Sequence, residues 1–191
     1  MRLYTHYTHT GFCNSYLIGP DGGGDAILVD PGVFDAHLLS LIEDSGLYLR
    51  YILVTHAHDG HVGGIRTIQK IYESRIFYYG HSVLNTHTTR VREGEDLELG
   101  EFRVQVLETP GHSGDAVVYK LDRLLFTGDT LLAGSIGSTP DDFSKGVLIS
   151  SINEKILALD DEHFIFPGHG PPSKVGIERL LNPDLLDEVR A

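Results

Sequence analysis

Four apolar segments of the sequence each run directly into a short turn that carries a histidine or an aspartate. YILV at 51–54 leads into THAHDGH, VQVLE at 104–108 into TPGH, RLLF at 123–126 into TGD, and HFIF at 163–166 into PGHG. Apolar runs of this length are typical of buried strands, and glycine permits the sharp turns that follow them. Because the carboxyl ends of strands gather at one side of an open α/β sheet, we expect these polar side chains to lie close together.

Strand and helix patterns alternate along the rest of the chain. Strands are predicted for RLYTHYTHT, CNSYLIG, AILVD, YILV and RIFYYG in the first half, and for EFRVQVLE, AVVYKL, RLLFTG and HFIF in the second. Helices are predicted over residues 34–46, about 63–74, within 141–160 and within 174–182. The polar segment 80–100 is predicted to be a loop with surface histidines at His81 and His87. We expect one α/β domain over residues 1–191, with helices outside the sheets.

Composition and charge exclude several classes of protein. The formal net charge is −12, with Lys and Arg scattered, so we expect no nucleic-acid partner. No apolar run approaches the roughly 20 residues that span a bilayer, and the start does not resemble a signal peptide. We therefore expect a cytoplasmic protein with a small-molecule substrate and no membrane partner. The single cysteine, Cys13, cannot form an intrachain disulfide, which fits a reducing compartment. The oligomeric state stays open.

The four polar turns together indicate a metal site. A TGD or PGH turn by itself is typical of a helix cap, and a chain with 11 histidines also produces chance clusters. Four such turns after four strands, one of them holding HxHxxH, are hard to explain as independent turns. Imidazole and carboxylate ligands suit Zn²⁺, Fe, Mn or Ni. No thiolate is expected nearby, so the donor set gives no further preference for zinc.

In these motifs the sequence resembles the metallo-β-lactamase superfamily, and specifically a short form of its glyoxalase II-like (hydroxyacylglutathione hydrolase-like) branch. The resemblance covers nearly the whole chain and rests, in order, on FCNSYLIG, AILVDPG, THAHDGHVGG, TPGHSGD, LLFTGDTLLAGSIGST and FPGHGPPSKVGIERLLNP. It implies an α/β fold, a four-layer αββα sandwich of mixed sheets with the metal site at one edge. It also implies a metal-dependent hydrolase that acts on a thioester or a related ester.

The resemblance implies a centre of two divalent ions, with Zn²⁺ expected and Fe or Mn as alternatives. Carried over position by position, the first ion would be held by His56, His58 and His112, the second by His61 and His169, and both by a bridging Asp129. Two cations would lower the pKa of a water between them, and the resulting hydroxide would attack a carbonyl carbon.

One position departs from the family pattern His-x-His-x-Asp-His. Position 60 is glycine, and the carboxylate stands one residue earlier, at Asp59. One residue turns a side chain by roughly 100° in a helical turn. Asp59, our candidate catalytic residue, therefore has three possible roles: a metal ligand in a rebuilt loop, a partner of a ligating histidine, or a solvated turn residue. Without a carboxylate at position 60, the second site should bind its metal more weakly.

The sequence leaves alternatives open for both the substrate and the class of reaction. The family string GSIGRTD is GSIGSTP here, with Ser138 in place of arginine, so glutathione specificity does not follow from the resemblance. An oxidoreductase resembling the persulfide dioxygenases of the same superfamily, which use one iron, is the alternative that the missing carboxylate favours. Retention of His61 and His169 favours the two-metal hydrolase. A metal-binding protein without activity is the third reading.

Overall fold

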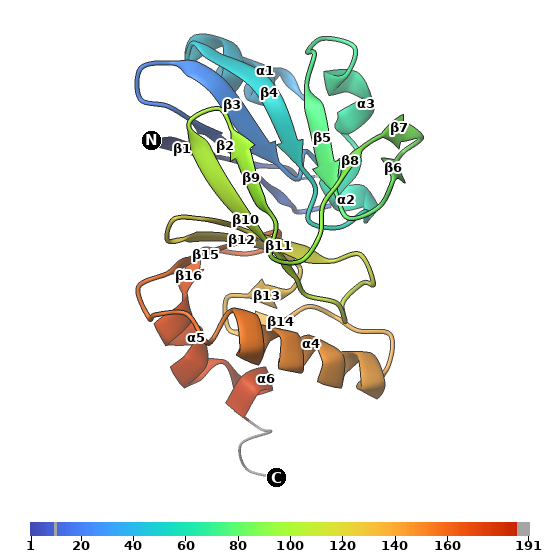
Figure 1. Ribbon diagram of the computed structural model, residues 1–191, viewed down its shortest axis with the longest axis vertical. Coiled ribbons are helices and arrows are strands. Elements are labelled where there is room, and N and C mark those ends of the chain that lie inside the picture. The colour runs from blue at the N-terminus through green and yellow to red at the C-terminus, as the bar shows by residue number, and fades with distance from the viewer. Residues whose placement is uncertain (10, 187–191) are drawn as a thin grey trace.

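Two six-stranded β-sheets pack face to face, and helices cover the outer side of each sheet (Figure 1). The structure is a computed structural model that describes residues 1–9 and 11–186. Its layers are helices, sheet, sheet and helices, which confirms the αββα sandwich expected from the sequence. Each half of the chain forms one sheet, so ligands from the two halves meet only where the sheets meet.

The first half of the chain forms the sheet β1-β2-β3-β4-β5-β8. Its strands are β1 (Arg2–Tyr7), β2 (Asn14–Gly19), β3 (Gly24–Val29), β4 (Leu47–Leu53), β5 (Arg75–Tyr78) and β8 (Thr89–Arg90). The first three strands are antiparallel, and β3, β4, β5 and β8 run parallel. The helices of this half are α1 (Ala36–Asp44), α2 (Asp59–Val62) and α3 (Ile65–Ile68), and β6 (Ser82–Val83) and β7 (Thr86–His87) form a hairpin.

The second half forms the sheet β16-β15-β12-β11-β10-β9. Its strands are β9 (Asp96–Leu99), β10 (Phe102–Glu108), β11 (Val117–Leu121), β12 (Leu124–Gly128), β15 (Phe164–Pro167) and β16 (Ser173–Lys174). Its helices are α4 (Asp142–Lys155), α5 (Val175–Leu181) and α6 (Pro183–Leu186), and β13 (Leu131–Leu132) pairs with β14 (Ser135–Ile136). The parallel pair β12 and β15 delivers two of the polar turns to the same end of this sheet.

Apolar side chains form three separate layers of core. One cluster fills the space between the sheets and contains the fully buried aromatic residues Tyr16, Tyr119 and Phe126. A second lies between the first sheet and its helices, and a third between the second sheet and α4 and α5. The central strand β3 is buried on both faces over residues 26–29, which explains its unbroken apolar run AILV in the sequence.

The helix predicted at about 63–74 is wrong in extent, because within that segment residues 65–68 alone form a helix, α3, and the separate helix α2 ends before it at Val62. The amide of Gly64 donates to the carbonyl of Pro31 (2.8 Å), so the helical hydrogen bond to residue 60 is not made. Beyond α3, Lys70 and Ile71 bond to residues only three positions back. Ile71 continues the apolar period but is 54% exposed. The helical pattern therefore extends past the helix itself.

The segment 80–100, predicted to be a loop, contains β6, β7, β8 and β9. In β9, Leu97 and Leu99 point into the core while Glu98 is exposed, so four residues complete the edge of the second sheet. Two strong charges in a four-residue strand hid this alternation. Within the described residues, no helix is long and apolar enough to cross a membrane.

Candidate metal centre

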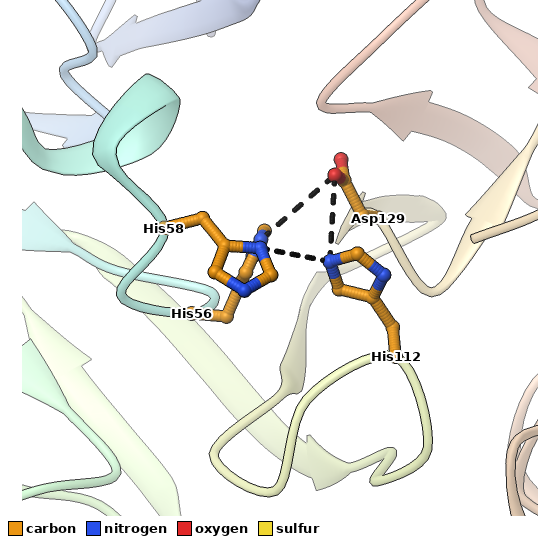
Figure 2. A group of neighbouring side chains, drawn as sticks. All are labelled: His56, His58, His112 and Asp129. Carbon is orange, nitrogen blue, oxygen red and sulfur yellow. Dashed lines mark hydrogen bonds and ion pairs between the residues drawn. The ribbon is translucent and has the colours of Figure 1, made fainter. Parts of the chain in front are cut away.

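Three histidines and an aspartate form the first group of possible ligands. His56 and His58 follow β4, His112 follows β10, and Asp129 follows β12. One ligand atom from each residue lies within 4.8 Å of the others. Figure 2 shows the four side chains converging, with His112 Nε2 3.0 Å from His58 Nδ1. The turns after three different strands thus reach one point, as the sequence pattern predicts.

A second group lies beside the first and contains a thiol. It consists of Cys13, immediately before β2, His61 in α2, and His169 after β15. Cys13 Sγ lies 3.6 Å from His169 Nε2 and 3.9 Å from His61 Nε2. Cys13 and His61 are buried, while His169 is partly exposed. Sequence reasoning placed no thiol near the site, and the structure corrects that expectation.

The carboxylate of Asp129 lies between the two groups. Its Oδ2 atom is 3.8 Å from His56 Nε2 and 3.6 Å from His112 Nε2, both in the first group. The same oxygen is 3.4 Å from His169 Nε2, and Oδ1 is 3.4 Å from His61 Nε2 in the second group. One carboxylate can therefore serve ions in both places.

The donor atoms fit divalent metal ions. A tetrahedral ion with metal–nitrogen bonds near 2.1 Å separates two ligand atoms by about 3.4 Å. The separations around Asp129 and between His58 and His112 lie close to this value. His56 Nε2 and Asp129 Oδ1 are buried and have no hydrogen-bond partner in the described part of the chain. Buried polar atoms normally have partners, so each of these atoms fits a bound cation, His56 Nε2 in the first group and Asp129 Oδ1 in the second.

Outer contacts hold the imidazole rings so that Nε2 faces the centre. The Nδ1 atom of His112 faces the carbonyl of Ser138 (2.7 Å), and that of His169 faces the carbonyl of Phe12 (2.9 Å). A carbonyl can only accept, so Nδ1 carries the proton and Nε2 keeps its lone pair for a metal. His58 differs, since its Nδ1 atom faces the centre.

Asp30 organises both groups from a buried position behind them. Its carboxylate accepts hydrogen bonds from the amide and the hydroxyl of Thr55, and it lies 3.1 Å from His61 Nδ1. The Thr55 hydroxyl in turn lies 3.1 Å from His56 Nδ1. Asp30 follows β3 and has a φ of 49°. The buried aspartate thus orients one histidine directly and another through threonine.

Asp115 supports the turn that carries the first two histidines. Its Oδ2 atom accepts a hydrogen bond from the amide of Ala57, which stands between His56 and His58, and another from the hydroxyl of Tyr78. Burial raises the pKa of Asp115, but these hydrogen bonds outweigh that effect and hold the pKa below its usual range. An ionised Asp115 therefore anchors the turn from the second half of the chain.

Burial and hydrogen bonding shift several pKa values in the centre. Burial lowers the pKa of His56 to about 4. Hydrogen bonding to Asp129 and Cys13 raises the pKa of His169 to about 10. Burial raises the pKa of Asp129, but the neighbouring imidazoles of His169 and His61 outweigh it and hold that pKa far below its usual range. For Cys13 burial acts in the same direction, and the same two histidines outweigh it, lowering the pKa to about 7.

In the absence of a metal, these shifts favour an ionised Asp129 and Cys13 beside protonated His61 and His169. Burial lowers the pKa of His61, but the neighbouring carboxylates of Asp129 and Asp30 outweigh it and raise that pKa to about 12. Metal ligands must be deprotonated, so a divalent cation would take the place of these protons.

All the predicted metal ligands lie together at the site, and the predicted catalytic residue does not. The structure brings together His56, His58, His61, His112, Asp129 and His169. Asp59 begins α2, is exposed, and belongs to neither group among residues 1–9 and 11–186. Of the three roles considered for Asp59, its position agrees with the solvated turn residue. His81 and His87 are exposed and also lie outside both groups of the described chain.

A groove of about 230 Å³ opens beside His112. Its walls come from the turn 110–114 and from the start of α4, where Phe143 is 82% exposed. The groove offers an apolar surface next to the first group of ligands.

Comparisons with known proteins agree with this geometry. The sequence profile described as the Metallo-beta-lactamase superfamily matches residues 9–169. The mitochondrial persulfide dioxygenase ETHE1 of Mus musculus is 33% identical over 184 residues, covering 90% of this chain and 70% of that protein. Hydroxyacylglutathione hydrolase GloC of Haemophilus influenzae is 31% identical over 191 residues, covering 86% of this chain and 89% of that protein. The crystal structure of BLEG-1 B3 metallo-beta-lactamase has a TM-score of 0.88 at 26% identity, covering 96% of this chain and 99% of that one.

Proposed function

The chain belongs to the metallo-β-lactamase superfamily, and from that premise we propose that it is a two-metal hydrolase of a small-molecule thioester or related ester. The observation that carries the proposal is the position of Asp129 between two separate groups of ligands. A one-metal enzyme needs only the first group. The similarity to a hydroxyacylglutathione hydrolase over 86% of the chain supports the same reaction class.

The ligand residues named above would hold the ions, with Zn²⁺ as the expected metal. Bound divalent cations would supply Lewis acidity and lower the pKa of water to about 7. Hydrolysis adds water across the acyl–sulfur bond: a carbon–oxygen bond forms, the carbon–sulfur bond breaks, and a proton of water leaves with the thiol product.

The chain's own residues would orient the substrate and hold the donors in place. Asp30 and the carbonyls of Phe12 and Ser138 hold imidazole rings, and Asp115 holds the turn that carries His56 and His58. Little reorganisation is therefore needed when an ion binds. The groove beside His112, with Phe143 at its rim, is the place where an apolar acyl group would lie. Replacing Phe143 by alanine should therefore raise KM more than it lowers kcat.

Metal analysis and a substrate panel test the proposal together. Protein purified without chelator or affinity-tag metal should contain two zinc ions per chain and should hydrolyse a member of a thioester, ester, lactone and phosphoester panel. The persulfide dioxygenase relative supplies the competing reading. About one iron per chain, with oxygen uptake on a persulfide and no hydrolysis of the panel, would replace the hydrolase by that oxidoreductase.

A further inference from the structure

We propose that Cys13 is a ligand of the second metal and that its thiolate takes the place of the carboxylate missing at position 60. This inference rests on the two-metal centre of the proposed function and assigns a donor to it. In the family pattern, the second site receives an aspartate from the position that is Gly60 here. The question is which atom of this chain occupies that space.

The sulfur of Cys13 occupies it. A Cβ atom built on Gly60 would lie 2.6 Å from Cys13 Sγ, and apart from the adjoining residues and the backbone of α2 no other atom of the described chain lies within 4 Å of that Cβ position. The side chain of an aspartate at position 60 and the thiol of Cys13 therefore exclude each other. Gly60, which lacks the family carboxylate, therefore leaves room for a different donor, the sulfur of Cys13.

The distances also match those around a metal. A tetrahedral zinc ion, with Zn–S near 2.3 Å and Zn–N near 2.1 Å, holds a sulfur and a nitrogen about 3.6 Å apart. Cys13 Sγ is 3.6 Å from His169 Nε2 and 3.9 Å from His61 Nε2. Asp129 Oδ1, a buried atom without a hydrogen-bond partner in the described chain, lies 3.4 Å from the same nitrogen of His61. Sulfur, two nitrogens and a carboxylate oxygen form a complete donor set for zinc.

The backbone around Cys13 is shaped to hold it against His169. The carbonyl of Phe12 accepts from Nδ1 of His169, and Phe12 adopts a φ of 53°, which is unfavourable for an aromatic residue. On the other side, Asn14 donates its backbone amide to the carbonyl of Gly168 and its side-chain amide to Pro167 and Gly170. Phe12 and Asn14 thus bind the turn that carries His169 on either side of Cys13, and the thiol of Cys13 faces Nε2 of His169.

The competing interpretation is a buried thiol with no role in metal binding. Cys13 Sγ lies 3.4 Å from the carbonyl of Gly11, and that hydrogen bond would satisfy an uncharged thiol. The two interpretations predict different spectra and different metal contents, and the chain makes the distinction clean because it contains one cysteine.

Cobalt substitution tests the proposal without relying on activity. The protein loaded with two Co²⁺ per chain should show a near-ultraviolet charge-transfer band from one thiolate, and the zinc form should show one sulfur at about 2.3 Å by X-ray absorption. Cys13→Ser should lose the band and keep the first metal. Its affinity for the second metal should fall by more than the roughly 10- to 100-fold that loss of an outer partner costs.

A reciprocal swap distinguishes ligation from a structural role. Cys13→Ala combined with Gly60→Asp clears the sulfur and restores the family carboxylate, so the second metal should return without the band. Cys13→Ala combined with Gly22→Asp is the matched control, because apart from the adjoining residues nothing in the described chain lies within 4 Å of the Cβ position of Gly22. That control should stay at one metal per chain.

Two results would overturn the proposal: a fully loaded native protein without the band, or a Cys13→Ser variant that binds both metals with unchanged affinity. These outcomes test the role of Cys13 independently of whether the protein is a hydrolase. A protein that shows the band but hydrolyses nothing in the panel keeps Cys13 as a ligand and loses the hydrolase. A hydrolase without the band does the reverse.

Discussion

The two groups of ligands contain similar side chains but are assembled in different ways. In the first group, His56 and His58 come from a single turn, and His112 and Asp129 close the site from the other sheet. In the second group, Cys13, His61 and His169 come from three separate segments, and two of these side chains are buried. The comparison shows that a short motif can supply two ligands of one metal site, whereas each ligand of the neighbouring group comes from a different segment and depends on how those segments pack.

Asp129→Asn should have the largest effect and should affect both groups equally, because the carboxylate of Asp129 lies beside histidines of both groups. The amide has no negative charge, so we expect loss of metal from both sites. Activity should fall by more than the roughly 10- to 100-fold typical of outer partners. Elemental analysis and kcat/KM measure the effect. His58→Ala is the comparison variant and should lower metal content at the first site alone. Full metal content in both variants would show that the ligand assignment is wrong.

Asp30→Asn should affect the second group more than the first. The carboxylate faces His61 directly but reaches His56 only through Thr55. Oδ2 faces both the Thr55 hydroxyl and His61 Nδ1, so an amide nitrogen in its place leaves two of the three buried hydrogen bonds without an acceptor. The free energy of unfolding should fall by at least about 1–3 kcal/mol. Affinity for the second metal should fall by roughly 10- to 100-fold. Denaturant unfolding and metal titration measure the two effects.

Asp122→Asn is the matched control for that variant. Asp122 is exposed and has a φ of 50°, beside the 49° of Asp30, so both variants place asparagine in the same backbone conformation. It should leave stability and metal affinity unchanged. Equal losses in the two variants would mean that the backbone, and not the hydrogen bonds of Asp30, causes the effect.

Tyr78→Phe should give the smallest effect and should be confined to the first group. It removes one hydrogen bond to Asp115, which keeps its bond to the amide of Ala57. We expect a loss of about 1 kcal/mol in stability and only a few-fold weaker binding of the first metal. Metal titration at each site checks this, with Tyr48→Phe, at an exposed tyrosine, as the control. A larger effect at the second site would contradict the separation of the two groups.

The sequence predicts the first group because its signals are local. His56 and His58 stand two residues apart after an apolar run, and Asp129 follows a strand of the same kind. Cys13 carries no such signal, since a single cysteine has no spacing to interpret and lies 47 residues before Gly60 in the chain. The available clue was the glycine itself. A side chain missing from an expected position leaves a volume that another segment must fill in a close-packed interior.

The fold divides in the same way between local and distant causes. The sandwich and most strands follow from apolar periodicity and from the family strings. The break between α2 and α3 does not, because the carbonyl of Pro31 takes the amide hydrogen of Gly64. The edge strand β9 does not either, because two inward leucines between charged residues are too weak a pattern. Both errors concern partners that only the folded chain brings together.

The position of the ligands at the meeting of the two sheets has a consequence for the molecule as a whole. Cys13, His56, His58 and His61 belong to the half of the chain that forms the first sheet, and His112, Asp129 and His169 to the half that forms the second. Each ion would therefore be shared between the halves and would act as a removable cross-link between them. Docking of the sheets and binding of metal then become one linked equilibrium, and a chelator should loosen the joint between the halves before it disturbs either sheet.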